Sequence, residues 1–228
     1  MLRYMNAKLL FYTLILGFLA TACVSPPDDF PSIPEISFHG LSYIELDGAS
    51  DSLKIAVKFR DAEGDLGLDP RAINPPFNEI EYLTDNNGNY ITYSNRPEGA
   101  PSYNPLDWII DPLINNEEIK DTLWVEYNPN YYNIFVKFFI KRGGNFTEFK
   151  WSDPPFYTTL DGRFPEILAG DNQQSIEGVI EYSMLSSGWR PIFRNDTIRI
   201  DVQIQDRALN RSNTVSTPNF TLNQIQVK

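Results

Sequence analysis

The sequence predicts an all-β protein, an antiparallel β-sandwich that is either one large sandwich or two small ones. Three observations support this prediction. Apolar and polar residues alternate with a period of two in several short stretches, clusters of Gly, Asn, Asp and Pro separate those stretches, and no long stretch has the periodicity of an amphipathic helix. Short antiparallel strands joined by turns bury their apolar faces by packing sheet on sheet.

Residues 52–60 and 197–205 are the clearest predicted strands. In each, four large apolar residues occupy alternate positions, with mainly charged or polar residues between them. The residues expected to face inward are Leu53, Ile55, Val57 and Phe59 in the first strand and Ile198, Ile200, Val202 and Ile204 in the second. Burial of a side chain of this size contributes about 1.5 to 3 kcal/mol, so we expect these faces to form much of the core.

Each of the two strands ends in an aspartate, Asp61 or Asp206, before a polar turn. The strands align throughout when Ser52 is placed on Thr197. One explanation is chance similarity between alternating strands, since Asp is common at strand exits. The other is a pair of related sandwich halves, with a boundary near residues 161–172, where Gly, Pro and Asn cluster.

The remaining predicted strands alternate less clearly. They are residues 35–46, 79–83, 90–93, 123–127, 133–141, 146–151, 156–160, 176–184 and 213–222. Asn87-Gly88 and Gly143-Gly144 suit the positive φ angles of hairpin turns. Phe135 and Phe139 lie opposite the aliphatic residues of their strand, which we therefore expect to be covered on both faces. Residues 115–122 are expected to form at most a short turn of helix.

Residues 1–22 have the layout of a secretory signal. Arg3 and Lys8 give a positive head, an apolar run follows, and small residues lead into Cys23. The run is shorter than the roughly 20 apolar residues of a membrane-spanning helix. The stretch resembles the lipobox of bacterial lipoproteins, with Ala20 where that family usually has Leu. This resemblance implies that the signal is removed and that lipid on Cys23 anchors the mature chain to a membrane.

Residues 23–34 are rich in Pro and Asp, which predicts a flexible or semi-extended tether before a β-sandwich region at residues 35–228. The Ser-Pro-Pro-Asp-Asp-Phe sequence in this tether resembles the acidic signal that sends lipoproteins of Bacteroidota-type bacteria to the cell surface. The resemblance implies an outer-membrane location with display at the cell surface. The alternative is an ordinary solvated linker on a protein of the periplasmic face.

The chain is acidic, with 30 Asp and Glu against 19 Lys and Arg and a formal net charge of −11. Loss of Arg3 and Lys8 with the signal lowers this charge to about −13. Such a chain is not expected to bind nucleic acid and is repelled by anionic lipid headgroups. We therefore expect the membrane contact to come from acyl chains on Cys23, which contribute about 0.8 kcal/mol for each buried CH₂.

The composition also argues against several enzyme classes. Cys23 is the only cysteine and His39 the only histidine, which leaves no disulfide framework, no thiolate metal site and no histidine-rich metal site. A Ser-His-Asp arrangement is disfavoured, and His39 is expected to be a partly buried structural residue. The sequence has no phosphate-binding loop and no dinucleotide-binding fingerprint. It therefore predicts a protein that is not an enzyme and has no cofactor, with calcium as the one ion to consider.

Residues 61–69 form an acidic loop with carboxylates at its first, third, fifth and ninth positions. These residues are Asp61, Glu63, Asp65 and Asp69. Alternating carboxylates converge on hard cations, which predicts a calcium site. The loop departs from the EF-hand pattern at Leu66 and Ala72, where Gly and Glu are expected. The alternative is a solvated strand-exit turn in which Gly64 and Gly67 supply positive φ angles.

Residues 59–67 and 205–213 together resemble a group of uncharacterised Bacteroidota-type lipoproteins. They read Phe-Arg-Asp-Ala-Glu-Gly-Asp-Leu-Gly and Gln-Asp-Arg-Ala-Leu-Asn-Arg-Ser-Asn. The second also resembles the Asp-x-Ala-Gly-Asn-x-Ser ending of bacterial immunoglobulin-like modules, with Leu209 in place of the glycine. These resemblances imply an immunoglobulin-like fold and a surface or periplasmic location, and they imply no activity.

Residues 77–108 are rich in Tyr, Asn, Gly and Pro. The aromatic residues that could form a ligand platform are Tyr82, Tyr90, Tyr93, Tyr103 and Trp108. Exposed aromatic rings beside amides are a common way to bind sugars. In the alternative, the same rings pack under a loop or at the edge of a core.

Taken together, these features predict a lipid-anchored outer-membrane lipoprotein that acts as a non-enzymatic binding or structural module. The sequence does not identify its ligand, which would be a glycan or a protein. The alternative functions are a carboxylate-dependent glycan hydrolase and a glycan-binding accessory protein. The chain has 30 acids, but no spacing singles out a catalytic pair.

Overall fold

The computed structural model describes residues 30–46, 48–168 and 174–227, and Pro31–Lys228 form one compact unit. The predicted signal peptide and Cys23 lie outside the described residues, as do residues 169–172 of the suggested boundary region. The described end of the tether meets the loop after the second strand, where the Ala62 amide donates to the Pro31 carbonyl (3.0 Å). Within the described ranges, no helix is long and apolar enough to cross a membrane.

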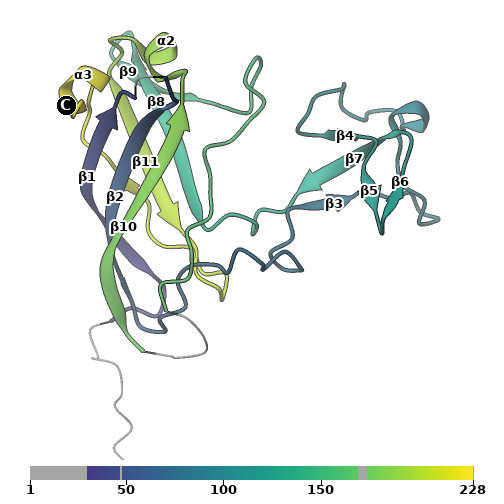
Figure 1. Ribbon diagram of the computed structural model, residues 1–228, viewed down its shortest axis with the longest axis horizontal. Coiled ribbons are helices and arrows are strands. Elements are labelled where there is room, and N and C mark those ends of the chain that lie inside the picture. The colour runs from purple at the N-terminus through teal and green to yellow at the C-terminus, as the bar shows by residue number, and fades with distance from the viewer. Residues whose placement is uncertain (1–29, 47, 169–173, 228) are drawn as a thin grey trace, which may run out of the picture. The chain divides into compact units, whose positions relative to one another are not determined.

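Two antiparallel sheets form the main body of the fold (Figure 1). The first sheet, in the order β1-β2-β10, consists of β1 (Glu35–Ile44), β2 (Asp51–Asp61) and β10 (Ile176–Ser186). The second, in the order β12-β11-β8-β9, consists of β12 (Val215–Ser216), β11 (Ile198–Ile204), β8 (Ile134–Arg142) and β9 (Asn145–Phe149). The sheets thus place β2 and β11, which are far apart in sequence, in opposite layers.

Side chains from both sheets meet in one hydrophobic core, so these sheets form a single sandwich. All eight inward-facing residues predicted for β2 and β11 are buried, whereas Lys58 on the opposite face of β2 is exposed. The register of β2 follows from this alternation, since a slip by one residue would turn its lysines inward. The prediction of an all-β antiparallel sandwich is confirmed.

A short helix, α2 (Trp189–Phe193), contributes two large aromatic side chains to the core. Trp189 and Phe193 both stack on Phe138 of β8, each with ring centroids 5.7 Å apart. Trp151, which follows β9, meets Trp189 edge-on at 5.6 Å. Aromatic pairs of this kind contribute about 0.5 to 1.5 kcal/mol beyond the area they bury. The helix is therefore held by its side chains rather than by its length.

The outward face of β8 carries two phenylalanines that are half-buried under arginines. The Arg211 guanidinium lies 4.1 Å from the ring centroid of Phe135, and that of Arg199 lies 4.5 Å from the ring centroid of Phe139. Both are cation–π contacts. The sequence predicts cover on both faces of this strand, and the structure provides it on the outer face in part by guanidinium groups.

Between β2 and β8, the chain forms two further small sheets. One has the order β3-β7-β4, with β3 (Ile80–Tyr82), β7 (Thr122–Tyr127) and β4 (Trp108–Ile110), and the other pairs β5 (Leu113–Ile114) with β6 (Glu117–Glu118). A 3₁₀ turn, η1 (Tyr93–Asn95), precedes β4. The three-stranded sheet buries Trp108, Leu123 and Val125, so this insertion has apolar packing of its own.

Residues 115–122, expected to form at most a short turn of helix, form none, and their first half is the tip and second strand of the β5–β6 hairpin. Asn115 and Asn116 at the tip have φ angles of 52° and 65°. Asn tolerates this left-handed conformation, and two such residues in succession make a tight hairpin turn.

Two predicted strands in the middle of the chain are not regular strands. Residues 90–93 make only isolated bridges, from Tyr90 to Thr84 and from Thr92 to Leu123. Residues 156–160 form no strand, because Tyr157 has a φ of 43°, which an extended chain does not allow.

The last predicted strand, residues 213–222, is mostly irregular. Only β12 within it is paired as a strand. Pro218 follows soon after, and proline has no amide hydrogen to donate to a continued ladder. Thr221 and Gln224 then form a capping box that begins α3 (Leu222–Ile225).

Candidate metal centre

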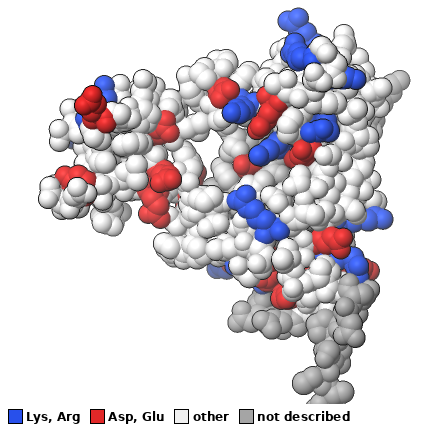
Figure 2. All heavy atoms as spheres, turned by 180° about the vertical axis from the view of Figure 1, so that it is seen from behind, with Lys and Arg blue, Asp and Glu red and all other residues white. Residues whose placement is uncertain are grey.

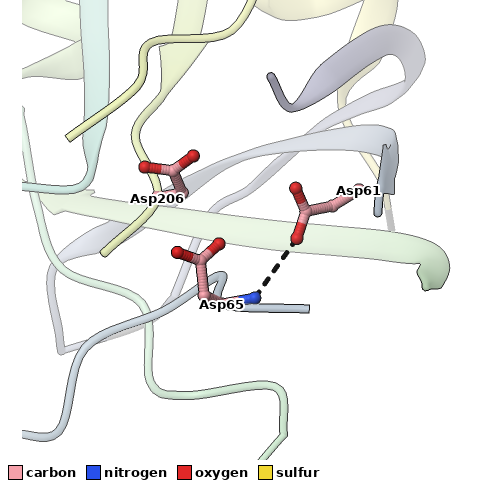
Figure 3. Close-up of side chains that lie close together, drawn as sticks. All are labelled: Asp61, Asp65 and Asp206. Carbon is pink, nitrogen blue, oxygen red and sulfur yellow. Dashed lines mark hydrogen bonds between the residues drawn. The ribbon is translucent and has the colours of Figure 1, made fainter. Parts of the chain in front are cut away.

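Three carboxylates from two distant parts of the chain converge at one end of the sandwich (Figure 3). Asp61 is the last residue of β2, Asp65 lies in the loop that follows, and Asp206 lies two residues beyond β11. One oxygen from each of the three lies within 4.8 Å of the others. Because Asp61 and Asp206 end strands in opposite sheets, the cluster bridges the two layers.

The loop after β2 is shaped by the Asp61 side chain. Its Oδ2 accepts hydrogen bonds from the amides of Gly64 (2.7 Å) and Asp65 (3.2 Å). Gly64 has a φ of 72°, and a Cβ at this position would clash with the carbonyl oxygen of Gln174. Glycine is therefore required here, and the resulting turn brings Asp65 back toward Asp61.

A similar aspartate-capped turn follows β11. The Oδ1 of Asp206 accepts from the Asn210 amide (2.7 Å), and its Oδ2 accepts from Nδ2 of the same residue (3.0 Å). Leu209, which stands where the immunoglobulin-like pattern has Gly, adopts a φ of 68°. The turn is thus kept without the glycine, and Asn210 orients the Asp206 carboxylate.

The two turns are joined by hydrogen bonds to Asp65. Its carbonyl accepts from the Arg207 amide (3.1 Å), and its Oδ2 accepts from the Ala208 amide (3.2 Å). Leu66 and Asp206 also form a β-bridge. These bonds hold the loop after β2 against the turn after β11.

The electrostatics of the cluster are unfavourable for three bare carboxylates. Asp61 is 0% exposed and Asp206 3% exposed. Burial, followed by the negative charges of Asp65 and Glu63, raises the pKa of Asp61 to about 6. Burial and the charge of Asp65 also raise the pKa of Asp206. In each case the hydrogen bonds of the turn oppose the rise without cancelling it.

Several oxygens of this region are buried and accept no hydrogen bond. They are Oδ1 of Asp61, Oδ1 of Asp65 and Oε2 of Glu63. A buried carboxylate oxygen without a partner is costly, so a native protein ordinarily supplies a donor or a cation. An oxygen-only group of this kind has the chemistry of a hard-cation site such as calcium.

The structure brings together two of the four acids predicted from the loop. Asp61 and Asp65 belong to the cluster, and Glu63 lies close enough for its charge to affect Asp61. Asp69 is not in the cluster but forms a salt bridge with Arg71 at 2.6 Å. The alternation of acids therefore predicts cluster members at the start of the loop but not at its ninth position, where the Arg71 guanidinium binds the carboxylate of Asp69.

Asp206 was not among the predicted ligands. The one signal for it in the sequence is the alignment of residues 197–205 with residues 52–60, which places Asp206 opposite Asp61. The two explanations considered for that alignment were chance similarity between alternating strands and a pair of related sandwich halves. In the structure, the aligned strands face each other across one core, and their final aspartates meet.

A carboxylate pair also suits glycoside hydrolysis, which needs a sugar ring between the two groups. Asp61 and Asp206 are too deeply buried for a sugar ring to reach them. The cluster therefore suits an enclosed ion better than a glycan substrate.

The predicted aromatic platform divides into two ring groups. Tyr82 meets Tyr90 edge-on at 5.8 Å, whereas Tyr93 contacts Tyr103 at 6.1 Å and Trp108 at 4.9 Å. Trp108 is 1% exposed and stacks on Trp124, so it packs as part of the small core. Tyr90 and Tyr103 are 40% and 45% exposed and are the members that solvent reaches most.

His39 lies on β1 and is exposed, so the expectation of a partly buried histidine is wrong. His39 continues the exposed positions of Glu35 and Ser37, and the register shift between Phe38 and Gly40 leaves it without a partner in β2. His39 contributes nothing to the acidic cluster.

Comparison of the chain with protein-family models, with curated proteins and with solved structures gave no match.

Proposed function

We propose that the protein is a lipid-anchored lipoprotein of the outer membrane whose β-sandwich acts as a non-enzymatic binding or structural module. The observation that carries the proposal is the order of features at the N-terminus, where a positive head, an apolar run and small residues lead into the single cysteine, Cys23. The first strand begins at Glu35, so a short Pro-rich and Asp-rich segment separates the cysteine from the folded body. This spacing suits an anchor and a tether.

The anchor is tested by expressing the full chain in a bacterium that processes lipoproteins, as wild type and as Cys23→Ser. We expect the wild type in the outer-membrane fraction, with an intact mass equal to residues 23–228 plus acyl groups. Cys23→Ser should lose both the added mass and the membrane retention, while Ser25→Ala, a change two residues away, should keep both. Recovery of wild-type protein without added mass, or membrane retention of Cys23→Ser, would contradict the proposal.

Display at the cell surface, rather than on the periplasmic face, is the second part of the proposal. It is supported by the likeness of the acidic tether to surface-export signals. Treatment of intact cells with a protease should remove the protein, and a periplasmic marker should survive. Survival of the lipoprotein in cells whose outer membrane is intact would place it on the periplasmic face instead.

Glycan binding is a second candidate, favoured by the exposure of Tyr90 and Tyr103. Exposed aromatic faces contribute to sugar binding through stacking. If the module binds a polysaccharide in a pull-down, Tyr90→Ala and Tyr103→Ala should weaken retention without lowering the melting temperature by more than a few degrees. Equal retention by both variants would remove these residues from the binding surface.

A further inference from the structure

We propose that Asp61, Asp65 and Asp206 bind one calcium ion that joins the two sheets of the sandwich. The proposal concerns the folded body only and does not depend on the lipid anchor. It differs from the site predicted from the loop alone, because it omits Asp69 and takes a ligand from the turn after β11.

The first step is the convergence of the three carboxylates. Figure 3 shows the Asp61 carboxylate pointing toward those of Asp65 and Asp206, and one oxygen from each lies within 4.8 Å of the others. A calcium ion binds oxygens at 2.3 to about 2.6 Å, so two of its ligands stand at most roughly 5 Å apart. The spacing of the three oxygens therefore fits a single ion between them.

The second step is independent of the clustering and concerns hydrogen bonds. Asp61 is completely buried, and the turn uses only its Oδ2, which leaves Oδ1 without a donor. Oδ1 of Asp65 is likewise buried and unpartnered, while its other oxygen accepts from Ala208. Each side chain thus holds its loop with one oxygen and keeps the other free, which is the arrangement a bound cation requires.

The third step is the charge around the cluster. Arg207, the cation next to Asp206 in the sequence, directs Nη1 toward Oε1 of Glu166 at 3.7 Å. Glu63 adds a further negative charge near Asp61. Arg207 thus forms its ion pair with Glu166, and the proposed divalent cation would supply the positive charge that the three carboxylates need.

The choice of calcium follows from the donor atoms. The cluster offers only oxygen ligands, the single histidine is exposed on β1, and the single cysteine is Cys23, so the nitrogen and sulfur ligands of zinc and copper are missing. Magnesium demands near-ideal octahedral geometry and keeps most of its waters. Calcium accepts irregular sets of carboxylates from separate segments, with carbonyls or waters completing six to eight ligands.

The ion would act as a clamp between the layers. Asp61 ends β2 in the three-stranded sheet, and Asp206 follows β11 in the four-stranded sheet. A cation between them converts repulsion between buried like charges into attraction and fixes this end of the sandwich. The sheets would then separate less readily when calcium is present.

The test is a calorimetric titration of calcium chloride into the detergent-solubilised full chain after removal of bound metal by chelation. We expect one site per chain with a dissociation constant on the order of 10⁻⁴ to 10⁻³ M, the range of extracellular calcium modules. The melting temperature should rise with calcium, and magnesium at the same concentration should bind at least about tenfold more weakly.

Matched variants locate the site. Asp65→Asn and Asp206→Asn should each weaken calcium binding at least about tenfold, whereas Asp69→Asn, in the same loop but paired with Arg71, should bind like the wild type. In chelator, Asp61→Asn should melt no lower than the wild type, because it relieves repulsion, and calcium should no longer raise its melting temperature. Circular dichroism identifies any variant that fails to fold. If Asp206→Asn fails to fold, Asp65→Asn, at the less buried position, tests the site in its place.

Two results would overturn the proposal. One is the absence of both heat and a melting shift up to about 10 mM calcium, well above the expected dissociation constant. The other is equal loss of binding in Asp69→Asn and Asp206→Asn, which would indicate diffuse attraction to an acidic surface.

Discussion

At the scale of single residues, the two oxygens of Asp61 have different roles. One caps the turn after β2 by accepting from two amides, and the other is buried without a donor. The turn also depends on Gly64, whose φ is 72° and whose missing side chain leaves room for the carbonyl of Gln174. Because the loop depends on both the buried cap of Asp61 and the glycine at position 64, we expect substitutions that remove either feature to destabilise it.

Gly64→Ala should lower the free energy of unfolding by about 2 kcal/mol or more, because it combines a left-handed backbone with a clash against backbone atoms. The control is Gly88→Ala, at a φ of 82° but with nothing within 4 Å of the added carbon. It should cost only about 1 kcal/mol. Urea unfolding of both variants measures the difference, and equal losses would mean that the clash is relieved by movement of the Gln174 segment.

Asp161 provides a pH-dependent contribution to stability that is separate from the acidic cluster. Burial raises the pKa of its carboxyl above the ordinary 3.8, although the Val136 amide and the charges of Arg211 and Lys137 oppose the rise. The folded state therefore holds the proton more tightly than the unfolded chain does. Stability from this group is greatest below pH about 4 and falls as pH rises through the raised pKa.

Asp161→Asn should remove this decline, because the amide does not ionise and its oxygen still accepts from Val136. Urea unfolding between pH 4 and pH 7 should show a smaller loss of stability with rising pH in the variant than in the wild type. Asp85→Asn is the opposite control, since hydrogen bonds from Asn89 and Asn87 lower the pKa of Asp85. An unchanged pH profile in Asp161→Asn would show that this carboxyl ionises equally in both states.

At the scale of elements, α2 shows how a helix of five residues becomes fixed. An isolated helix shorter than about 12 to 15 residues is marginally stable in water, so the stability of this helix comes from packing. Trp189 and Phe193 are both fully buried and stack on Phe138 of β8. The helix thus depends on the sheet beneath it.

Trp189→Ala should destabilise the protein by about 3 to 5 kcal/mol, the usual cost of emptying a large aromatic site. Trp189→Phe should cost much less, because the Nε1–H of Trp189 donates no hydrogen bond that the change would remove and the stacked ring is kept. Leu185→Ala, on the exposed face of β10, should change stability by no more than about 0.5 kcal/mol. Denaturant midpoints rank the three, and a small loss in Trp189→Ala would show that α2 is not part of the cooperative core.

The strands illustrate which elements alternation is able to predict. β2 and β11 agree with their predicted ranges to within one residue at each end. Burial of one face of a strand makes apolar and polar residues alternate with a period of two, and this alternation is visible in the sequence itself. The β5–β6 hairpin was not predicted and the strand over residues 156–160 is wrong, because positive φ angles at Asn115, Asn116 and Tyr157 decide both segments. Such angles leave no periodic signal.

At the scale of the whole molecule, the net charge bears on the proposed attachment to a membrane. The face shown in Figure 2 has Lys and Arg interspersed with Asp and Glu, without one continuous basic area. The net charge of −11 makes electrostatic attachment to anionic lipid unfavourable. Attachment should therefore come from the acyl chains alone.

Flotation with lipid vesicles separates these contributions. Purified lipidated protein should float with both zwitterionic and anionic vesicles, whereas Cys23→Ser should float with neither at physiological salt. Raising the salt concentration should leave the binding of lipidated protein nearly unchanged, because screening does not weaken acyl insertion. Flotation of Cys23→Ser with anionic vesicles would reveal a basic surface that the net charge conceals.

The sequence by itself determined the all-β class, the register of β2 and β11, and the pairing of Asp61 with Asp65 in one turn. These are local properties, since alternation and turn chemistry act over a few residues. Only the tertiary structure decided that there is one sandwich core and that Asp206 joins Asp61. Contacts between sheets depend on how two layers pack, and no pattern of neighbouring residues records which strand ends will meet.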